Sequence, residues 1–570
     1  MSDVRALLAR ARDWMADDPD PLTRAELGRL LQAATSPGDS GAALAELADR
    51  FSGPLEFGTA GLRGPLGAGQ SRMNRATVIR TAAGLGGYLR EHGGDSVVVG
   101  FDARHGSDVF ARDTCAVLTA AGLSAMVLPR PLPTPVLAFA IRHLGADAGV
   151  MVTASHNPPQ DNGYKVYLCD GSQIVPPADA EISAHIEAVG PVRQVRRAED
   201  GWHTLGDADV LEPYLHRVVS LLPPGPRDLR LVYTPMHGVG GQVVHDALVA
   251  AGFPRPGVVP AQAMPDPDFP TVAFPNPEEP GALDLAFAAA REAAADLVIA
   301  NDPDADRCAL AIPDPAVPSG WRMLRGDEVG VLLGWHLVTR GLPAGSVLAT
   351  SIVSSTLLGK IAAAHGLGSA RTLTGFKWIG RVPGLAYGYE EALGYCVDPA
   401  AVADKDGVSA ALLAAELAAG LKAAGRGLTD VLDELARTYG VHATDQLSVR
   451  VPDRALIWAA LDRLRGTPPA SLGGRGVQRV EDLAAGVDGL PPTSGLRLTL
   501  SGDAWVVVRP SGTEPKLKCY LEVVEPLGPV SGPVSSTDTA RDERLATARA
   551  AADATLRAMR LELAGVLGLG

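Results

Sequence analysis

Short apolar runs alternate with alanine-rich stretches of helical length over the first three quarters of the chain. The runs are typical of strands, and each is followed by a turn; they cover residues 96–100, 126–128, 230–233, 297–300 and 346–350. Such alternation predicts layered α/β domains with mostly parallel or mixed sheets. Three runs enter their loops in a comparable way, at 99–102, 232–235 and 348–351, which indicates a weak internal repeat.

Proline and glycine breaks suggest where domains meet. Residues 222–226 (Leu-Pro-Pro-Gly-Pro) follow a helical pattern that begins at Leu211, so this helix is predicted to lead from a first domain to a second. Further breaks lie at 312–320 and near 440–442. The last region is of α+β type, and residues 525–539, rich in Pro, Gly and Ser, are predicted to form a mobile insertion before a final amphipathic helix.

Ser155 is the leading candidate for a nucleophile. It follows the apolar run 148–152, so a turn would place its hydroxyl at the carboxyl end of a strand, where open α/β sheets bind ligands. The next residue is His156, and because adjacent side chains diverge it cannot simply act as the base of a serine triad. The segment Thr-Ala-Ser-His-Asn-Pro at 153–158 therefore favours phosphoryl chemistry.

A second segment supplies carboxylates for a metal ion. Asp302, Asp304 and Asp306 follow the apolar run 297–300, and in an extended chain every second side chain falls on one side. Oxygen ligands suit Mg²⁺. A calcium loop of the EF-hand type needs Gly and Glu where this chain has Arg307 and Pro313, so that alternative fails. A solvated acidic turn is the simpler alternative, but three spaced aspartates after a buried-type strand favour metal binding.

A third segment, at residues 509–518, offers donors for a phosphate. Arg509 contributes a fork of N–H groups, and the following Pro-Ser-Gly-Thr turn contributes hydroxyls and backbone N–H groups. By itself the segment is equally typical of a hairpin turn with surface charges.

Together these segments resemble the α-D-phosphohexomutase family, the phosphoglucomutase and phosphomannomutase enzymes. The resemblance covers most of the chain and includes Leu-Glu-Phe-Gly-Thr-Ala-Gly-Leu-Arg-Gly at 55–64, Thr-Gly-Phe-Lys-Trp-Ile-Gly at 374–380 and Tyr-Glu-Glu-Ala-Leu-Gly-Tyr at 389–395. The amino-acid sequences at 57–63, 274–279 and 404–410 are similar to those of the branch with phosphoglucomutase and phosphopentomutase activities.

The resemblance implies an α/β protein with three similar layered domains, mixed sheets and a C-terminal α+β phosphate-binding domain, with the active site in a central cleft. We expect the first domain, with an N-terminal helical extension and the phosphoserine loop, at residues 1–212. The magnesium loop belongs to a second domain at 213–322, the sugar-binding loop to a third at 323–442, and the phosphate loop to a fourth at 443–570.

The resemblance also implies catalytic and metal-binding roles. Ser155 would carry a phosphate between two oxygens of a sugar. Mg²⁺ would be held by Asp302, Asp304 and Asp306 together with Ser155, through a phosphoserine oxygen. Lys165 would help proton transfer, Arg63 would position the reacting groups, and His156 would do the same or support the loop.

The remaining site residues would bind the substrate. Arg307 would contact phosphate or sugar beside the metal, and Lys377 would bind the far side of the sugar. Glu391 would bind sugar hydroxyls, with Glu390 the second choice by register. The phosphate that is not reacting would be held by Arg509, Ser511, Gly512, Thr513 and Lys518.

The implied reaction interconverts a sugar 1-phosphate and 6-phosphate through a phosphoserine enzyme, with glucose 1,6-bisphosphate as intermediate and activator. Glucose phosphate is our first choice of substrate, then pentose phosphate, then mannose phosphate. The family's sugar loop usually runs Gly-Glu-x-Ser-Gly-His, and here Leu393 and Tyr395 replace the Ser and His, so the preferred sugar stays open. A sugar-1,6-bisphosphate synthase or a phosphatase would use the same phosphoserine, whereas a non-catalytic binding protein should have lost Ser155 or the aspartates.

Bulk composition restricts the partners. The formal net charge of −14 argues against broad binding to nucleic acid or to an anionic membrane. Five cysteines without Cys-x-x-Cys spacing argue against a disulfide framework and a zinc site. Residues 1–20 predict an amphipathic helix and not a signal peptide. We therefore expect a cytoplasmic enzyme that acts on a small phosphosugar, as a monomer or homodimer.

Overall fold

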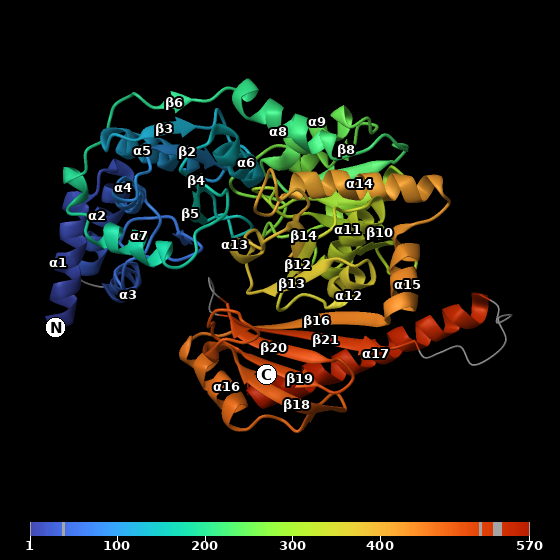
Figure 1. Ribbon diagram of the computed structural model, residues 1–570. Coiled ribbons are helices and arrows are strands. Elements are labelled where there is room, and N and C mark those ends of the chain that lie inside the picture. Colours follow the sequence, from blue (N-terminus) through green and yellow to red (C-terminus); the bar gives the residue numbers. More distant parts are fainter. Residues whose placement is uncertain (1, 37–39, 512–515, 528–537, 569–570) are drawn as a thin grey trace. The chain divides into compact units, whose positions relative to one another are not determined.

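The computed structural model describes residues 2–36, 40–511, 516–527 and 538–568 (Figure 1). The chain forms two compact units, the first made of Met1–Leu324 with Gly394–Gly420 and the second of Arg325–Leu393 with Leu421–Gly570. Most of the insertion predicted at 525–539 lies outside the described residues.

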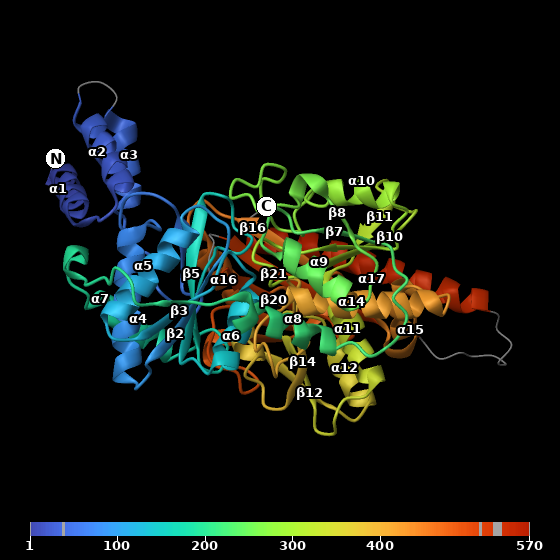
Figure 2. The ribbon, with the colours of Figure 1, turned by 90° about the horizontal axis from the view of Figure 1, so that it is seen from above.

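Three helices precede the first sheet: α1 (Ser2–Asp17), α2 (Pro21–Thr35) and α3 (Ser40–Arg50). They bury a small core of their own around Leu27, Leu47 and Phe51. In both ribbon views they lie beside the helices of the first domain (Figures 1 and 2). The amphipathic helix predicted at the start of the chain is confirmed.

The first sheet has the strand order β1-β5-β4-β2-β3-β6. Strands β4, β2, β3 and β6 run parallel to one another, whereas β5 pairs antiparallel with both β4 and β1. The strands are β1 (Leu62–Pro65), β2 (Ser96–Phe101), β3 (Ser124–Val127), β4 (Ala148–Val152), β5 (Asp161–Leu168) and β6 (His203–Thr204); the helices are α4 (Arg75–Glu91), α5 (Ser107–Ala120), α6 (Thr134–Leu144) and α7 (Ala178–Glu187).

The second sheet, in the order β11-β10-β9-β7-β8, repeats this plan. Strands β8, β7 and β9 are parallel, and β10 and β11 add on antiparallel. The strands are β7 (Leu231–Thr234), β8 (Gly257–Val258), β9 (Leu297–Ala300), β10 (Ala309–Pro313) and β11 (Trp321–Met323); the helices are α8 (Leu211–Ser220), α9 (Gly240–Ala250) and α10 (Asp284–Glu292).

The second unit contains the third set of parallel strands, in which β12 lies between β13 and β14. The strands are β12 (Val347–Ser351), β13 (Gly368–Thr372) and β14 (Leu385–Glu390); the helices are α11 (Gly326–Arg340), α12 (Leu357–Ala364), α13 (Phe376–Ile379) and α15 (Leu428–Tyr439). The chain then returns to the first unit with β15 (Gly394–Cys396) and most of α14 (Gly407–Ala423).

In each of the three sets of parallel strands, a loop with predicted site residues follows the same strand of the set. Each central strand (β2, β7, β12) has two parallel neighbours, and the neighbour that is later in the chain (β4, β9, β14) leads into a loop with predicted site residues. These loops carry Ser155, Asp302 and Glu391. The weak repeat at 99–102, 232–235 and 348–351 marks the ends of the three central strands, so it reflects a shared topology.

The last sheet is antiparallel throughout, in the order β16-β21-β20-β19-β18-β17. Its helices pack on one face, where residues such as Leu461 and Met559 join the core. The strands are β16 (Val441–Arg450), β17 (Ser471–Leu472), β18 (Arg475–Asp482), β19 (Leu496–Leu500), β20 (Trp505–Pro510) and β21 (Lys516–Glu525); the helices are α16 (Ala455–Gly466) and α17 (Asp538–Leu567). The α/β class, with three layered domains and a different C-terminal domain, is confirmed.

Within the described ranges, no single helix has the length and apolar composition needed to cross a membrane. One pair, α14 and α15, passes that test only when the two are counted together, and they are bent by 90° relative to each other.

Candidate active site

The Ser155 loop connects β4 to β5. Ser155 itself is 2% exposed and has a φ of +53°, the left-handed region that residues other than glycine seldom adopt. Its hydroxyl donates to Asp302 Oδ2 over 2.9 Å and lies 3.1 Å from His156 Nδ1. The expectation that the two adjacent side chains diverge is therefore wrong, because that expectation assumed extended backbone and the left-handed residue turns the side chains toward one another.

Arg104 holds this loop in shape. Its guanidinium donates to the carbonyl oxygens of Ser155 and Pro158, each over 2.7 Å, and also to those of Asn157 and Asp161. Its side chain is 1% exposed, and burial lowers its pKa although the nearby Asp102 carboxylate opposes the shift. Sequence reasoning missed this residue, and the only available signal was its position shortly after the strand 96–101.

The three aspartates converge through a turn. The ligand oxygens of Asp302, Asp304 and Asp306 all lie within 4.8 Å of one another, and the three residues are at most 1% exposed. Ala305 has a φ of +52°, and its N–H donates to the carbonyl oxygen of Asp302 over 2.9 Å. The extended conformation expected from the sequence is therefore wrong, since a tight turn and not strand alternation brings the carboxylates together.

The carboxylate cluster fits a hard divalent cation. Among the described residues, the Oδ1 atoms of Asp304 and Asp306 are buried without a hydrogen-bond partner. A buried carboxylate oxygen without a donor is costly, and a cation would satisfy it. Several carboxylate oxygens in one place are the ligand set that Mg²⁺ uses.

Two lysines compensate part of the cluster's negative charge. Lys165 Nζ lies 2.7 Å from Asp304 Oδ2 and 3.0 Å from Asp306 Oδ2. Lys405 Nζ lies 3.5 Å from Asp306 Oδ2. Sequence reasoning missed Lys405, although it belongs to the segment 404–410 that was matched to a branch of the family. Gly407 explains part of that match, because a Cβ there would lie 2.3 Å from the carbonyl oxygen of Arg307.

The pKa values of the carboxyl groups in the cluster shift in different directions. Burial raises the pKa of Asp302 well above its usual range, and the charges of Asp304 and Asp306 add to the effect. Burial also opposes ionisation of Asp306, but Lys165 and Lys405 outweigh it and lower the pKa of this carboxyl. Burial works against the charge of Lys165, yet Asp304 and Asp306 raise its pKa. The carboxyl that accepts from Ser155 is thus the one that holds a proton most readily.

Arg63 and Arg307 add further positive charge near the cluster. Arg63 lies opposite Gly163 in the β1–β5 pairing, and therefore on the same face of the sheet as Lys165. Burial lowers the pKa of Arg63, while Asp304 and Asp306 oppose the shift. Arg307 Nε lies 3.9 Å from carboxylate oxygens of Asp302 and Asp306. Every residue predicted to be catalytic or metal-binding therefore belongs to one compact unit.

The predicted sugar-binding residues belong to the second unit. Glu391 follows β14, and its Oε2 accepts from the hydroxyls of Ser351 and Ser354, each over 3.1 Å. Glu390 is the last residue of β14, and Lys377 lies on the short helix α13. All three side chains are partly buried.

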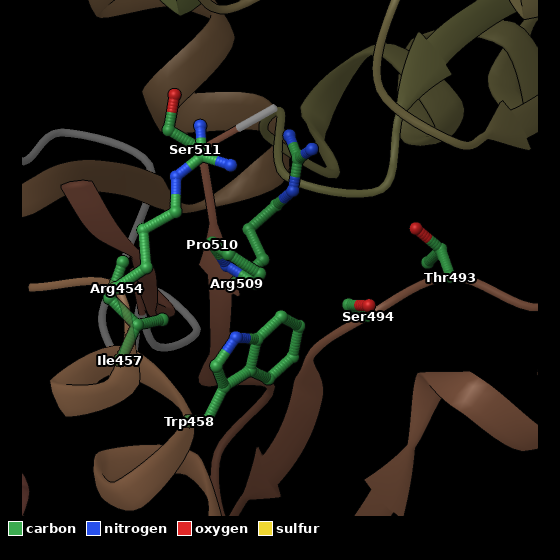
Figure 3. A pocket seen from close by; sticks show the side chains of 8 residues that line it. All are labelled: Arg454, Ile457, Trp458, Thr493, Ser494, Arg509, Pro510 and Ser511. Atoms are coloured by element: carbon green, nitrogen blue, oxygen red, sulfur yellow. The ribbon is translucent and has the colours of Figure 1, made fainter. Parts of the chain in front are cut away.

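The predicted phosphate loop also belongs to the second unit. Arg509 lies opposite Lys518 in the β20–β21 pairing, and the N–H of Ser511 donates to the carbonyl oxygen of Lys516 over 2.8 Å. Arg509 and Ser511 line one pocket, and Lys518 is not among its lining residues (Figure 3). Gly512 and Thr513 lie outside the described residues.

Comparison with known proteins explains this arrangement. Four models of one family match in order: phosphoglucomutase/phosphomannomutase alpha/beta/alpha domain I at residues 54–192, domain II at 212–315, domain III at 325–439, and the C-terminal domain at 447–526. The chain belongs to the phosphoglucomutase/phosphomannomutase family. It is a phosphohexomutase-type phosphosugar mutase, an intramolecular phosphotransferase.

Relatives of this mutase carry different substrate names. The "Probable phosphomannomutase" of Haemophilus influenzae is 47% identical over 456 residues, which cover 79% of this chain and 93% of that protein. The "Phosphopentomutase" of Mus musculus is 36% identical over 574 residues and 90% of both chains. A crystal structure of a putative phosphomannomutase from Thermus thermophilus has a TM-score of 0.66 and 28% identity, and the match covers 83% of this chain and 96% of that one.

Proposed function

We propose that this mutase interconverts glucose 1-phosphate and glucose 6-phosphate through a phosphoserine at Ser155 and a glucose 1,6-bisphosphate intermediate. One observation carries the proposal: the Ser155 hydroxyl donates to Asp302 over 2.9 Å, at the edge of a carboxylate cluster with unsatisfied oxygens. A phosphate on that hydroxyl would add oxygens beside a cation site. The same position suits phosphoryl transfer, whose barrier is largely electrostatic.

In the first half of the reaction, the free hydroxyl of the sugar attacks phosphorus. The new sugar O–P bond forms as the P–Oγ bond to Ser155 breaks; the sugar hydroxyl loses its proton and Ser155 Oγ takes one up. In the second half, Ser155 Oγ gives up its proton as it attacks the other phosphate of the bisphosphate, the bond from that phosphorus to the sugar oxygen breaks, and the departing sugar oxygen takes up a proton. His156 and Lys165 are the proposed residues for holding these protons, because His156 Nδ1 lies 3.1 Å from Oγ and Lys165 is bound to the same carboxylate cluster.

Asp302, Asp304 and Asp306 would hold Mg²⁺, which when bound offsets negative charge on phosphoryl oxygens. Arg63 and Arg307 would orient the phosphoryl group, because both carry guanidinium donors near the cluster. Arg104 would keep the Ser155 loop in its left-handed turn through its bonds to the loop carbonyls. Glu391, Glu390 and Lys377 would bind the sugar, and the loop 509–518 would bind the phosphate that is not transferred.

Replacement of Ser155 tests the carrier role. Ser155→Ala should reduce mutase turnover to background, because no oxygen remains to carry the phosphate, while the melting temperature stays close to that of the wild type. Ser124→Ala, at an exposed strand end, is the matched control and should keep full activity. Mass spectrometry should find phosphate at position 155 after incubation with glucose 1,6-bisphosphate. Near wild-type turnover of Ser155→Ala would refute the proposal.

Pentose phosphate is the second candidate substrate. The relative named phosphopentomutase aligns over 90% of both chains, and Leu393 and Tyr395, which replace polar residues of the usual sugar loop, are fully buried. A sugar reader with fewer polar side chains would suit more than one sugar. Measuring kcat/KM for glucose 1-phosphate, ribose 1-phosphate and mannose 1-phosphate with one preparation decides between them.

The same assay separates a mutase from a bisphosphate synthase. A mutase needs glucose 1,6-bisphosphate only in catalytic amounts and interconverts the monophosphates. A synthase would instead accumulate bisphosphate in proportion to the phosphoryl donor that is consumed.

A further inference from the structure

The pocket that contains Arg509 and Ser511 has a second arginine in its wall. It has a volume of about 280 Å³ and is also lined by Arg454, Trp458, Thr493 and Ser494. Arg454 immediately precedes α16, so it comes from a different element from Arg509, which ends β20. In Figure 3 the two arginine side chains extend in the same direction, and the guanidinium of Arg454 ends next to Ser511.

The two guanidinium groups lack counter-charges within the described part of the chain. Neither forms a hydrogen bond or an ion pair there, and the neighbouring Asp453 accepts from the N–H of Ala455 over 2.8 Å. Two other arginines of this domain, by contrast, do form ion pairs with carboxylates. Arg465, at the far end of α16, lies 2.5 Å from Asp462 and 2.8 Å from Asp482, and Arg497 lies 2.8 Å from Glu481 and 2.7 Å from Asp488.

We propose that Arg454 is a second guanidinium of the substrate phosphate site, acting with Arg509 on the phosphate that is not transferred. Two adjacent like charges repel each other, and a phosphate dianion between them removes that repulsion while accepting from both forks. The hydroxyls of Ser511 and Ser494 supply further donors in the same pocket. The volume is slightly below the usual range for a whole small-molecule site, so it suits the phosphate end of the sugar phosphate.

This inference rests on the proposed function and makes a specific kinetic prediction. The phosphate in this pocket is bound equally in the ground state and in the transition state, so losing a contact to it raises KM with little change in kcat. Because either phosphate of the sugar occupies the pocket in turn, KM should rise by the same factor for glucose 1-phosphate and glucose 6-phosphate. A contact to a sugar hydroxyl would not give this symmetry.

The test compares Arg454→Gln with Arg454→Lys and with the control Arg465→Gln. Arg454→Gln should raise both KM values about tenfold, the loss typical of one charge-assisted hydrogen bond. Arg454→Lys keeps the positive charge but not the forked guanidinium, so its KM values should lie between those of the wild type and those of Arg454→Gln. The inhibition constant of inorganic phosphate should rise in parallel. Arg465→Gln should leave these constants unchanged, because this arginine is already held by carboxylates and does not line the pocket.

A binding measurement separates this inference from the proposed reaction. Calorimetric titration of Ser155→Ala with glucose 6-phosphate, with and without Arg454→Gln, measures the pocket without phosphoryl transfer. A wild-type enzyme without mutase activity would contradict the proposed function while this comparison still tested Arg454. If Ser155→Ala and the double variant Ser155→Ala/Arg454→Gln bound glucose 6-phosphate with equal affinity, the proposed role of Arg454 would be overturned. An Arg454→Gln variant with a lower melting temperature but unchanged KM would overturn it as well.

Discussion

At the scale of single residues, the chemistry depends on charges that neutralise each other inside one unit. Lys165 is 2% exposed and contacts two of the three buried aspartates, so it is the main internal counter-charge of the cluster. Removing one member of a buried ion pair leaves an uncompensated charge, which is strongly destabilising. A bound cation supplies positive charge at the same carboxylates.

Lys165→Met should therefore make folding depend on divalent metal. In chelator, the first unit should lose about 3 to 5 kcal/mol of stability, and Mg²⁺ should recover much of it. Thermal melts of wild type and variant, each with chelator and with Mg²⁺, measure the effect. Lys360→Met, a partly exposed lysine whose Nζ lies 3.8 Å from Asp503, is the control. Equal melting temperatures of Lys165→Met and wild type in chelator would contradict this account of the cluster.

At the scale of elements, a buried acidic network joins the third set of strands to the last sheet within the second unit. Glu522 of β21 is fully buried and accepts from Ser355 Oγ over 2.5 Å, Thr356 Oγ1 over 2.7 Å and Trp505 Nε1 over 2.6 Å. The segment 351–356 also carries Ser351 and Ser354, which donate to Glu391. The last sheet thereby fixes the loop that positions the predicted sugar reader.

Asp327, near the start of α11, makes this network sensitive to pH. Burial raises its pKa to about 7, and repulsion from Glu391 and Glu522 adds to the effect. The folded state therefore binds a proton more tightly than the unfolded chain. Its contribution to stability is complete below about pH 4 and is lost as the pH rises through 7.

Asp327→Asn should remove this loss. Its Oδ1 accepts from the N–H of Ser355 over 2.7 Å and from the hydroxyl of Tyr389 over 2.9 Å, and an amide oxygen can accept both bonds. We expect the variant to be more stable than the wild type by about 2 to 4 kcal/mol at pH 8, with a much smaller difference at pH 5. Melting curves across this range measure it, with the exposed Asp503→Asn as control. A difference that does not change with pH would rule out the titration.

At the scale of the whole molecule, the chain crosses between its units at 324/325, 393/394 and 420/421, yet each cluster of polar residues is complete within one unit. All the residues proposed to hold the metal come from the first unit. The acidic network around Glu522 and the pocket with Arg454 come from the second.

Metal binding should consequently stabilise the first unit and leave the second unit unchanged. In hydrogen-deuterium exchange, Mg²⁺ should slow exchange in peptides that cover 153–165 and 301–308, because binding suppresses local opening around the ligands. Peptides that cover 351–356 and 441–450 should exchange at the same rate with and without Mg²⁺. Equal protection of both groups of peptides would show that the metal acts on the molecule as a whole.

Sequence patterns predicted the elements and motifs of this mutase because these are local properties. The apolar runs gave the central strands β2, β7 and β12, and residues such as Ser155, the three aspartates and Arg509 stand out by their neighbours in the chain. The residues that support them do not stand out. Arg104, Lys405 and Arg454 are ordinary charged residues in the sequence, and only their surroundings in the fold distinguish them.

The sequence by itself therefore determined the class of fold, the family and the residue types available for phosphoryl chemistry. Only the tertiary structure decided which of these residues meet. Ser155 and Asp302 are 147 residues apart, and they form a hydrogen bond because two similar sheets present equivalent loops to each other. The left-handed turns at Ser155 and Ala305 were also decided there, since a non-glycine residue adopts such a conformation only when surrounding contacts, here including those of Arg104, stabilise it.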